Sequence, residues 1–344
     1  MRKMTLITFL FVITIICLPI FSVASCTSWP KGEGWTKLEL NTKGSLSNVV
    51  ISPTNPNTVY AAVEDKSISE LLLSDNNGQT WQKISDFYGS NLEFDPVDPY
   101  SAYAHSWEGL KKTADGGNTW NVVLPMTTFR DATIFAISPS NPDVLYVGGY
   151  LGVYKTANGC QTWTDVSNGI DVGSNGVLAL TIDPSDSDVV FAGSNVGLFK
   201  TIDGGNHWFR TESGMEGSKY IVVTNIIIDP KSPSIVYVNV NGVVLKSIDS
   251  GSSWQQTHFY DNETKLPIQI VNWIISPDGG TIYALDFRND VYRYSTETDQ
   301  ASIIGEFGAI GNSGAHKPCC LATSSGQSQF IYVGTDVALY RYTK

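Results

Sequence analysis

The chain has 344 residues and a net charge of −11, and it is rich in glycine (31) and in aromatic residues (16 Tyr, 14 Phe and 9 Trp). Only 16% of its residues are charged, a composition that suits many short strands and tight turns better than helices. An acidic surface repels phosphate backbones, so we expect no nucleic-acid partner.

The N-terminus is predicted to be an export signal, residues 1–26. Arg2 and Lys3 precede an apolar run over residues 6–21, which is somewhat short for a membrane span of about 20 residues. Residues 23–26 (Val-Ala-Ser-Cys) resemble a bacterial lipobox, in which Cys26 becomes the lipidated first residue. The alternatives are ordinary cleavage near Ala24 or an uncleaved anchor. We expect an exported protein held at the membrane by lipid on Cys26, followed by a short linker over 27–33.

Five copies of one motif follow along the chain, each reading Ser/Thr-x-Asp/Asn-x-Gly-x-Thr-Trp with small departures. We call this motif the box. The copies cover residues 74–81, 113–120, 156–163, 201–208 and 247–254. Their tryptophans recur every 39 to 46 residues. A fixed period of this length, with several short strands in each unit, is typical of a β-propeller.

The units are counted by a strand that is centred on Tyr or Phe and that precedes the box in the first five units. It occurs seven times, at residues 59–61, 102–104, 145–147, 190–192, 236–238, 282–284 and 331–333. Unit six lacks a good box, and unit seven stops after its third strand. The segment 34–38 looks like the strand that follows a box elsewhere. We therefore predict an all-β, single seven-bladed β-propeller over 34–344, with four-stranded antiparallel blades and residues 34–40 completing the last blade.

These boxes resemble the Asp-box (BNR) repeats of sialidases, sortilin-type receptors, xyloglucan-hydrolysing glycosidases and the photosystem II assembly factor family. The resemblance covers residues 34–344 and implies a fold rather than an activity, because those families do different things. We expect the box residues to be structural, with a side-chain oxygen that accepts backbone N–H groups and a ring buried between sheets. They are Asn76, Trp81, Asp115, Trp120, Asn158, Trp163, Asp203, Trp208, Asp249 and Trp254.

Strand order assigns the loops to two faces. Loops between second and third strands share one face, the top face, with the crossings from blade to blade; boxes and the Ser/Asp-Pro turns share the bottom face. Propellers usually bind ligands at the top, by analogy between folds. We predict a ligand site there from aromatic, charged and amide side chains. The candidates are His105, Trp107, Glu108, Arg130, Asp131, Tyr150, Asp286 and Arg288. The alternative is that each is an ordinary loop residue.

A second pattern lies five residues before the proline that ends each first strand. Asparagine occupies this position four times, at Asn48, Asn91, Asn225 and Asn272. Asparagine is depleted in strands, so the repetition is unusual. The amides either form a partial polar ring near the axis or satisfy backbone groups of the neighbouring blade.

The sequence favours a binder over an enzyme. A sialidase needs an arginine cluster, and only Arg130 and Arg288 are expected at the top face. A glycoside hydrolase needs two carboxylates ~5–10 Å apart, a distance that sequence does not give, so it remains the alternative. With four scattered His and no Cys-x-x-Cys, we expect no metal and no cofactor. We predict a monomeric, non-catalytic module that binds a glycan or protein ligand outside the cytoplasm.

Overall fold

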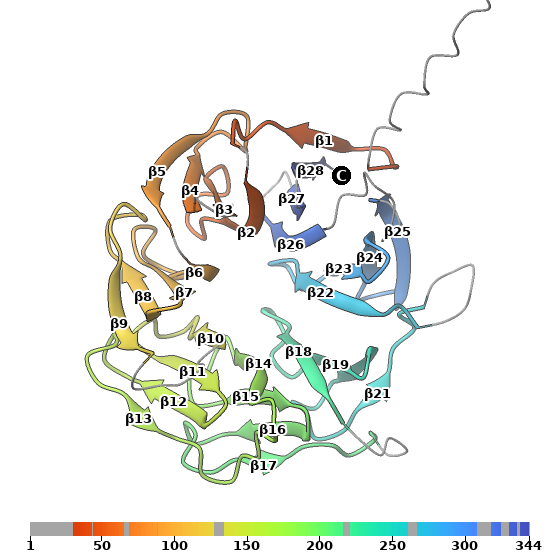
Figure 1. The fold of residues 1–344 in the computed structure, drawn as a ribbon. Helices are drawn as coiled ribbons and strands as arrows, with labels where there is room; N and C mark the ends of the chain where they lie inside the picture. The colour runs from red at the N-terminus through yellow and green to blue at the C-terminus, as the bar shows by residue number, and fades with distance from the viewer. Residues whose placement is uncertain are drawn as a thin grey trace, which may run out of the picture.

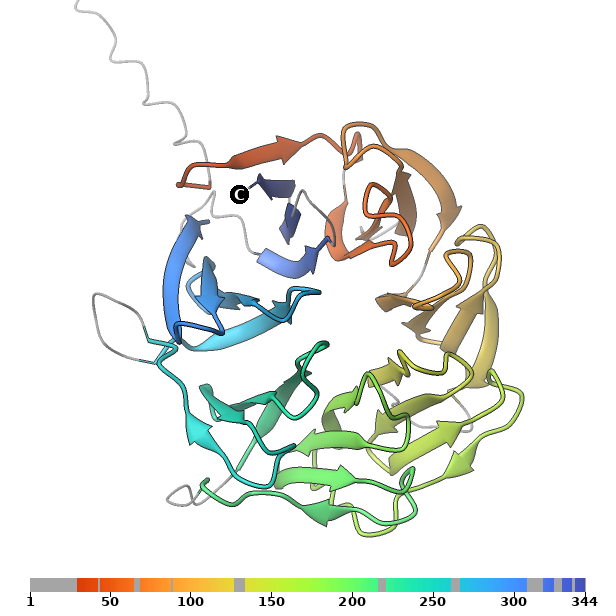
Figure 2. The same ribbon diagram turned by 180° about the vertical axis from the view of Figure 1, so that it is seen from behind.

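Each unit of the sequence folds into one four-stranded antiparallel sheet. The computed structural model describes residues 30–42, 44–64, 69–87, 89–126, 134–215, 221–260, 267–307, 318–324, 330–335 and 338–343. Within these residues the chain forms 28 strands in seven sheets and no helix. The prediction of an all-β, seven-bladed propeller is confirmed. The sheets stand around a common axis, as Figures 1 and 2 show from opposite sides.

We number the blades in chain order, and each runs from its innermost strand outward. Blade 1 contains β2 (Ser45–Ile51), β3 (Val59–Glu64), β4 (Ser69–Ser74) and β5 (Gln82–Asp86). Blade 2 contains β6 (Ser90–Phe94), β7 (Ala102–Ser106), β8 (Gly109–Thr113) and β9 (Asn121–Pro125). Blade 3 contains β10 (Ile134–Ile137), β11 (Leu145–Gly149), β12 (Gly152–Thr156) and β13 (Thr164–Asp165).

The remaining blades repeat this order. Blade 4 contains β14 (Val177–Ile182), β15 (Val190–Ser194), β16 (Gly197–Thr201) and β17 (Phe209–Arg210). Blade 5 contains β18 (Val223–Ile228), β19 (Val236–Val240), β20 (Val243–Ser247) and β21 (Gln255–Gln256). Blade 6 contains β22 (Ile270–Ile275), β23 (Thr281–Asp286), β24 (Asp290–Ser295) and β25 (Gln300–Glu306). Blade 7 contains β26 (Pro318–Thr323), β27 (Phe330–Thr335) and β28 (Leu339–Thr343).

The two ends of the chain close the ring. β1 (Trp35–Leu38) pairs antiparallel with β28 and becomes the outer strand of blade 7. Figure 1 shows this red N-terminal strand beside the blue C-terminal strands. The predicted closure by the N-terminal strand is confirmed, with the strand itself at 35–38 inside the expected 34–40. Closure leaves no open seam with unpaired strand edges.

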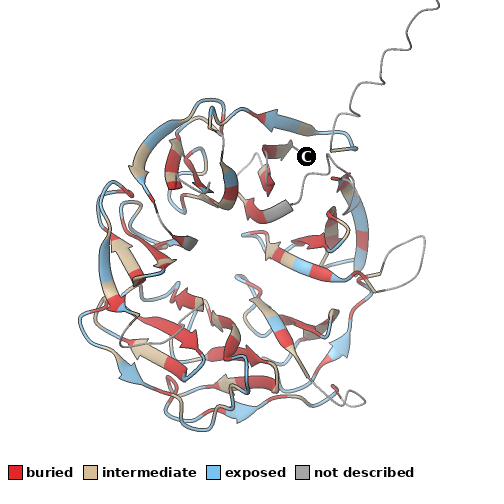
Figure 3. Ribbon diagram, in the orientation of Figure 1, coloured by how far each residue is buried: buried red, intermediate tan, exposed pale blue. Residues whose placement is uncertain are grey.

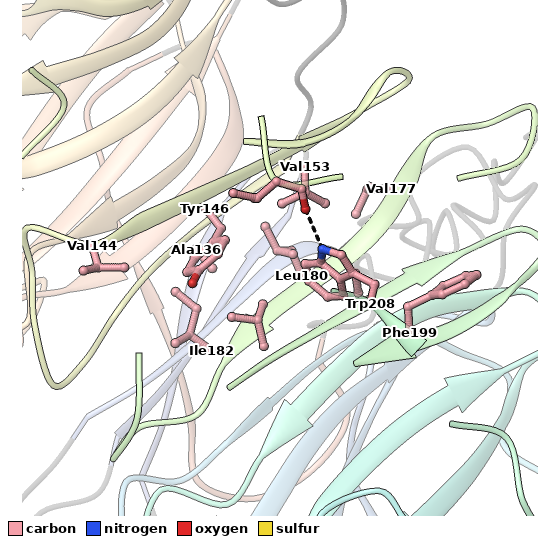
Figure 4. Close-up of a cluster of buried hydrophobic side chains, with 12 residues drawn as sticks. Ala136, Val144, Tyr146, Val153, Val177, Leu180, Ile182, Phe199 and Trp208 are labelled. Atoms are coloured by element: carbon pink, nitrogen blue, oxygen red, sulfur yellow. Dashed lines mark hydrogen bonds between the residues drawn. The ribbon is translucent and has the colours of Figure 1, made fainter. Parts of the chain in front are cut away.

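The hydrophobic core is divided among the spaces between blades. Each of seven apolar clusters draws on two neighbouring sheets. Second strands are the most buried, since they have a strand on each edge and a blade on each face (Figure 3). Figure 4 shows the cluster between blades 3 and 4, where the Trp208 indole N–H donates to the Val166 carbonyl at 2.6 Å.

Six of the seven innermost strands carry a register shift near their beginning. In blades 1, 5 and 6 the residue after the shift is Asn48, Asn225 or Asn272, the asparagines that the sequence aligns. A bulge leaves one residue out of the ladder and bends the strand. The repeated asparagine therefore marks a recurring bend in the strands closest to the axis.

The structure does not test the predictions of a lipid anchor at the membrane and of no bound metal. In the part of the chain that it describes, no helix has the length and apolar character to cross a membrane. Over the same residues, no three potential metal-binding side chains gather into one group. Cys160 and Cys320 are both buried. Cys26, the predicted lipid site, lies outside the described residues.

Candidate functional site

Hydrogen bonds between loops identify the two faces of the ring. Box loops are bonded to the turns between first and second strands, as in Gly204 N–H to Asp188 C=O at 3.0 Å. On the other side, loops between second and third strands are bonded to crossings, as in Asn241 N–H to Val222 C=O at 3.0 Å. The faces are therefore divided as strand order suggested, and the candidate residues of the second-to-third loops belong to the top face.

Among the described residues, the most exposed aromatic side chain at the top is Trp107, at the tip of the β7–β8 hairpin of blade 2. Its relative exposure is 74%. The next residue, Glu108, pairs with Lys111, and its carbonyl accepts the Met126 N–H at 2.9 Å. The hairpin tip is thus fastened at its base while the indole stands in solvent.

Blade 3 presents an aromatic side chain at the same turn position. Tyr150 and Leu151 occupy the tip between β11 and β12 and are 48% and 64% exposed. The closing pairs Ser106↔Gly109 and Gly149↔Gly152 show that Trp107 and Tyr150 are equivalent in the two hairpins. Two neighbouring blades therefore present large, partly apolar side chains at one level of the top face, and such exposure is typical of interaction surfaces.

The candidates from blade 6 form a network of their own. Asp286 is buried, and its Oδ1 accepts the backbone N–H groups of Arg288 and Asp290, both at 2.9 Å. The Arg288 side chain donates to Asp286 Oδ2 at 2.9 Å and to Tyr292 Oη at 2.7 Å. This is the chemistry of a rigid turn, and it lies across the ring from blades 2 and 3 (Figure 1).

The structure gives little support to the three other candidates, His105, Arg130 and Asp131. His105 is half-buried in β7, where it pairs in register with Ser90 and Leu110. Arg130 and Asp131 lie outside the described residues. The structure thus gives the predicted set one exposed aromatic pair, Trp107 and Tyr150, and a separate turn network at Asp286 and Arg288.

Glu93 was not among the predicted site residues. It lies on β6, the innermost strand of blade 2, and its side chain is exposed. Desolvation by the surrounding protein raises its pKa to about 8, against a smaller opposing effect of the Ile137 backbone. Because the Glu93 side chain is exposed, its pKa rises less than it would if the side chain were fully buried. The sequence did mark Glu93 as unusual, because the corresponding position of the innermost strand is apolar in most blades.

Three asparagines of the innermost strands, Asn48, Asn225 and Asn272, are half-exposed. Within the described residues, the side chains of Asn48, Asn225 and Asn272 form no hydrogen bond with the protein. The alternative that each amide bonds a backbone group of the next blade is therefore not seen for these three. Their donors and acceptors are available to water or to a polar ligand near the axis.

The boxes show one repeated set of hydrogen bonds. In blade 4, Asp203 Oδ1 accepts the His207 N–H at 2.9 Å and the Thr201 hydroxyl at 2.8 Å. Backbone and side-chain bonds from His207, with that of Thr201, hold the pKa of Asp203 at about 2. Asn76 and Asn158 accept the equivalent backbone N–H at 2.9 and 3.0 Å. An amide oxygen therefore serves this turn as well as a carboxylate does.

Comparison with known proteins supports the fold of this chain but does not assign it to a family. No family model matches the chain, and no curated protein matches it. Among solved structures it is similar to the GH74 xyloglucanase of Xanthomonas campestris, with 14% identity and a TM-score of 0.65 over 89% of this chain. It is also similar to YCF48 from Cyanidioschyzon merolae, with 14% identity and a TM-score of 0.62 over 90% of this chain.

A third similar structure is the extracellular domain of BT4673 from B. thetaiotaomicron, with 16% identity and a TM-score of 0.64 over 90% of this chain. This chain spans 53% of the xyloglucanase, 98% of YCF48 and 40% of the BT4673 domain. The neighbours include a glycoside hydrolase and an extracellular domain. At these identities the likeness establishes the propeller fold alone.

Proposed function

We propose that this protein is a non-catalytic binding or assembly module that works outside the cytoplasm and holds a glycan or protein ligand at its top face. The observation that carries the proposal is the exposed pair Trp107 and Tyr150 on adjacent blades. Each ring offers a flat apolar surface together with a polar atom, a combination enriched at binding surfaces. Sugar rings and peptide side chains are both suitable partners for such surfaces.

Two predicted site carboxylates at the top face already have partners, which supports a binder over a glycoside hydrolase. Glu108 is paired with Lys111, and Asp286 is buried in its turn with Arg288. Glu93 has the raised pKa of a proton donor, but it is the single acidic residue among the seven innermost strands of the structure. Hydrolysis of a glycoside needs a second carboxylate within ~5–10 Å of the first.

The proposed location rests on the N-terminal segment and on charge. A charged start, an apolar run and Cys26 support export followed by lipid anchoring, and a net charge of −11 disfavours nucleic acid as a partner. We further propose that the chain is an Asp-box (BNR) propeller, supported by the shared hydrogen bonds of its boxes. Cys26→Ser should move the protein from the membrane fraction to the soluble fraction of a bacterial host.

The ligand site is tested by binding. The purified protein is screened on a glycan array and against polysaccharides, and the strongest ligand is titrated against Trp107→Ala and Tyr150→Ala. Loss of a true aromatic anchor costs ~2 kcal/mol or more, about a thirtyfold weaker Kd. Tyr100→Ala is the matched control, because Tyr100 is a tyrosine of similar exposure, 65%, on the bottom face.

Two results would decide against the proposal. Unchanged affinity in both top-face variants would place the site elsewhere. Release of shorter saccharides during the screen would favour the glycoside hydrolase.

A further inference from the structure

The N-terminal segment is attached to the outer rim of the ring, at the boundary between blades 6 and 7. Lys31 and Glu306 exchange two backbone hydrogen bonds, at 3.0 and 3.1 Å, at the end of β25 in blade 6. The Trp35 indole N–H donates to the Ile304 carbonyl of the same strand at 2.7 Å. β1 then pairs with β28 as the outer strand of blade 7. The chain therefore enters the fold on the rim of these two blades.

A short connection separates this entry point from the proposed lipid site. Five residues lead from Cys26 to Lys31. An extended chain advances about 3.3–3.6 Å per residue, so this connection spans at most ~18 Å whatever its conformation. A compact domain of about 310 residues is roughly 50 Å across. The lipid is therefore held much closer to the rim of blades 6 and 7 than to the opposite side of the ring.

The proposed ligand site occupies that opposite side. In a ring of seven blades, the boundary between blades 6 and 7 lies opposite blade 3, and blade 2 is the neighbour of blade 3 (Figure 1). Trp107 and Tyr150 stand at the hairpin tips of these two blades. When the rim of blades 6 and 7 faces a membrane, the exposed aromatic pair is on the far side of the domain.

Neither face of the ring suits contact with that membrane. Exposed carboxylates are spread over the bottom face, in the boxes and in the turns between first and second strands, and they include Asp98, Asp115 and Asp188. Over the described residues of these loops, Lys231 is the one lysine or arginine. Anionic headgroups attract basic segments and repel an acidic surface. A membrane on the top face would cover the proposed ligand site, whereas contact through the rim leaves both faces free.

We propose that the lipid anchor holds this protein on edge, with the rim of blades 6 and 7 toward the membrane and the top-face site on blades 2 and 3 directed away from it. The ligand of that site is then a molecule outside the anchoring membrane and not one of its components. This inference rests on the proposed lipid anchoring and deepens the proposed binding function.

The test measures energy transfer from a fluorophore on the protein to an acceptor on lipid headgroups. The full chain, acylated in a bacterial host, is reconstituted into vesicles of phosphatidylcholine and phosphatidylglycerol. The fluorophore is attached at Ser302→Cys in blade 6 or at Thr164→Cys in blade 3, and wild type treated in the same way is the blank. The two positions are matched, because both are exposed and each pairs in register with the cation of its third strand, Arg293 or Lys155.

We expect the transfer from Ser302→Cys to exceed that from Thr164→Cys by ~3-fold or more, because the two labels lie on opposite sides of a domain roughly 50 Å across. A longer connection tests the cause. Insertion of about twenty Gly and Ser residues between Thr27 and Ser28 gives a flexible tether with a root-mean-square length of ~28 Å and a far greater maximum reach. The domain can then turn over, and the ratio should fall toward one.

Three results would overturn the inference while the anchor stands. Equal transfer from the two labels would mean that the anchored protein lies flat, and greater transfer from Thr164→Cys would mean that it stands the other way up. A difference that persists with the long tether would mean that the short connection does not set the orientation. Protein that lacks acyl mass on Cys26 and stays out of the vesicles would refute the anchor and this inference together. The titrations of Trp107→Ala and Tyr150→Ala test the ligand site separately.

Discussion

The closure of the ring can be tested at a single side chain, Trp35. Its indole N–H donates to the Ile304 carbonyl of blade 6 at 2.7 Å. The same ring contacts Phe307 edge-on at 5.2 Å and Tyr342 at 5.1 Å. Trp35 thus ties the N-terminal strand to blade 7 and to the neighbouring blade 6.

Trp35→Ala removes the hydrogen bond and both ring contacts. Truncation of a fully buried tryptophan costs about 3–5 kcal/mol, and since Trp35 is only half-buried we expect ~2–3 kcal/mol. For a domain of this size that free energy lowers the Tm by roughly 3–5 °C. The change is measured by thermal and urea unfolding, followed by near-ultraviolet circular dichroism.

Trp107→Ala is the matched control, because it is the same substitution at a side chain that is 74% exposed. Exposed positions without partners usually change stability by less than ~0.5 kcal/mol. We therefore expect Trp35→Ala to reduce stability and spare ligand binding, and Trp107→Ala to do the reverse. Equal Tm values for wild type and Trp35→Ala would refute the reasoning that the N-terminal strand closes the ring.

The remaining predictions concern titration and packing. The pKa values of Asp115, Asp203 and Asp249 are held at about 2 by hydrogen bonds within the boxes, chiefly from Thr119, His207 and Ser253. Because these pKa values are lower in the folded than in the unfolded state, the three carboxylates stabilise the fold above pH ~4, and that contribution is lost as the pH falls toward 2. Replacing all three by Asn should therefore make the Tm fall less steeply between pH 4 and pH 2. An unchanged fall in Tm would count against the hydrogen bonds of the boxes. Glu93 has the opposite sign, because a folded pKa raised to about 8 favours the protonated form, so its contribution is greatest below pH ~4.5 and declines as the pH rises through 8. Glu93→Gln should therefore be more stable than wild type at pH 9 and similar at pH 4, with the difference reduced by solvent because the side chain is exposed; a constant difference across this range would contradict the raised pKa. Gly193→Ala should cost about 1–3 kcal/mol in urea unfolding, because a Cβ there would lie 2.7–2.8 Å from Val223, and Gly280→Ala, with 3.5 Å of space, should be nearly neutral; equal costs would refute the packing argument.

The blade count, the order of strands in each blade and the closure of the ring could all be predicted from the amino-acid sequence. Each of these depends on residues close together in the chain, such as the box turn around Asp203 or the Tyr-centred second strand, and repetition makes the local signal hard to miss. The closing strand was found because residues 34–38 repeat the pattern that follows a box.

Which side chains are exposed and which are held by partners could not be predicted and follows from the three-dimensional structure. Asp286 and Arg288 looked like ligand-binding residues in the sequence, but the structure places both in one hydrogen-bonded turn, whereas Trp107 and Tyr150 stand in solvent. Likewise, Lys155 of blade 3 pairs with Asp188 of blade 4, and only the packing of one blade against the next brings these two residues into contact.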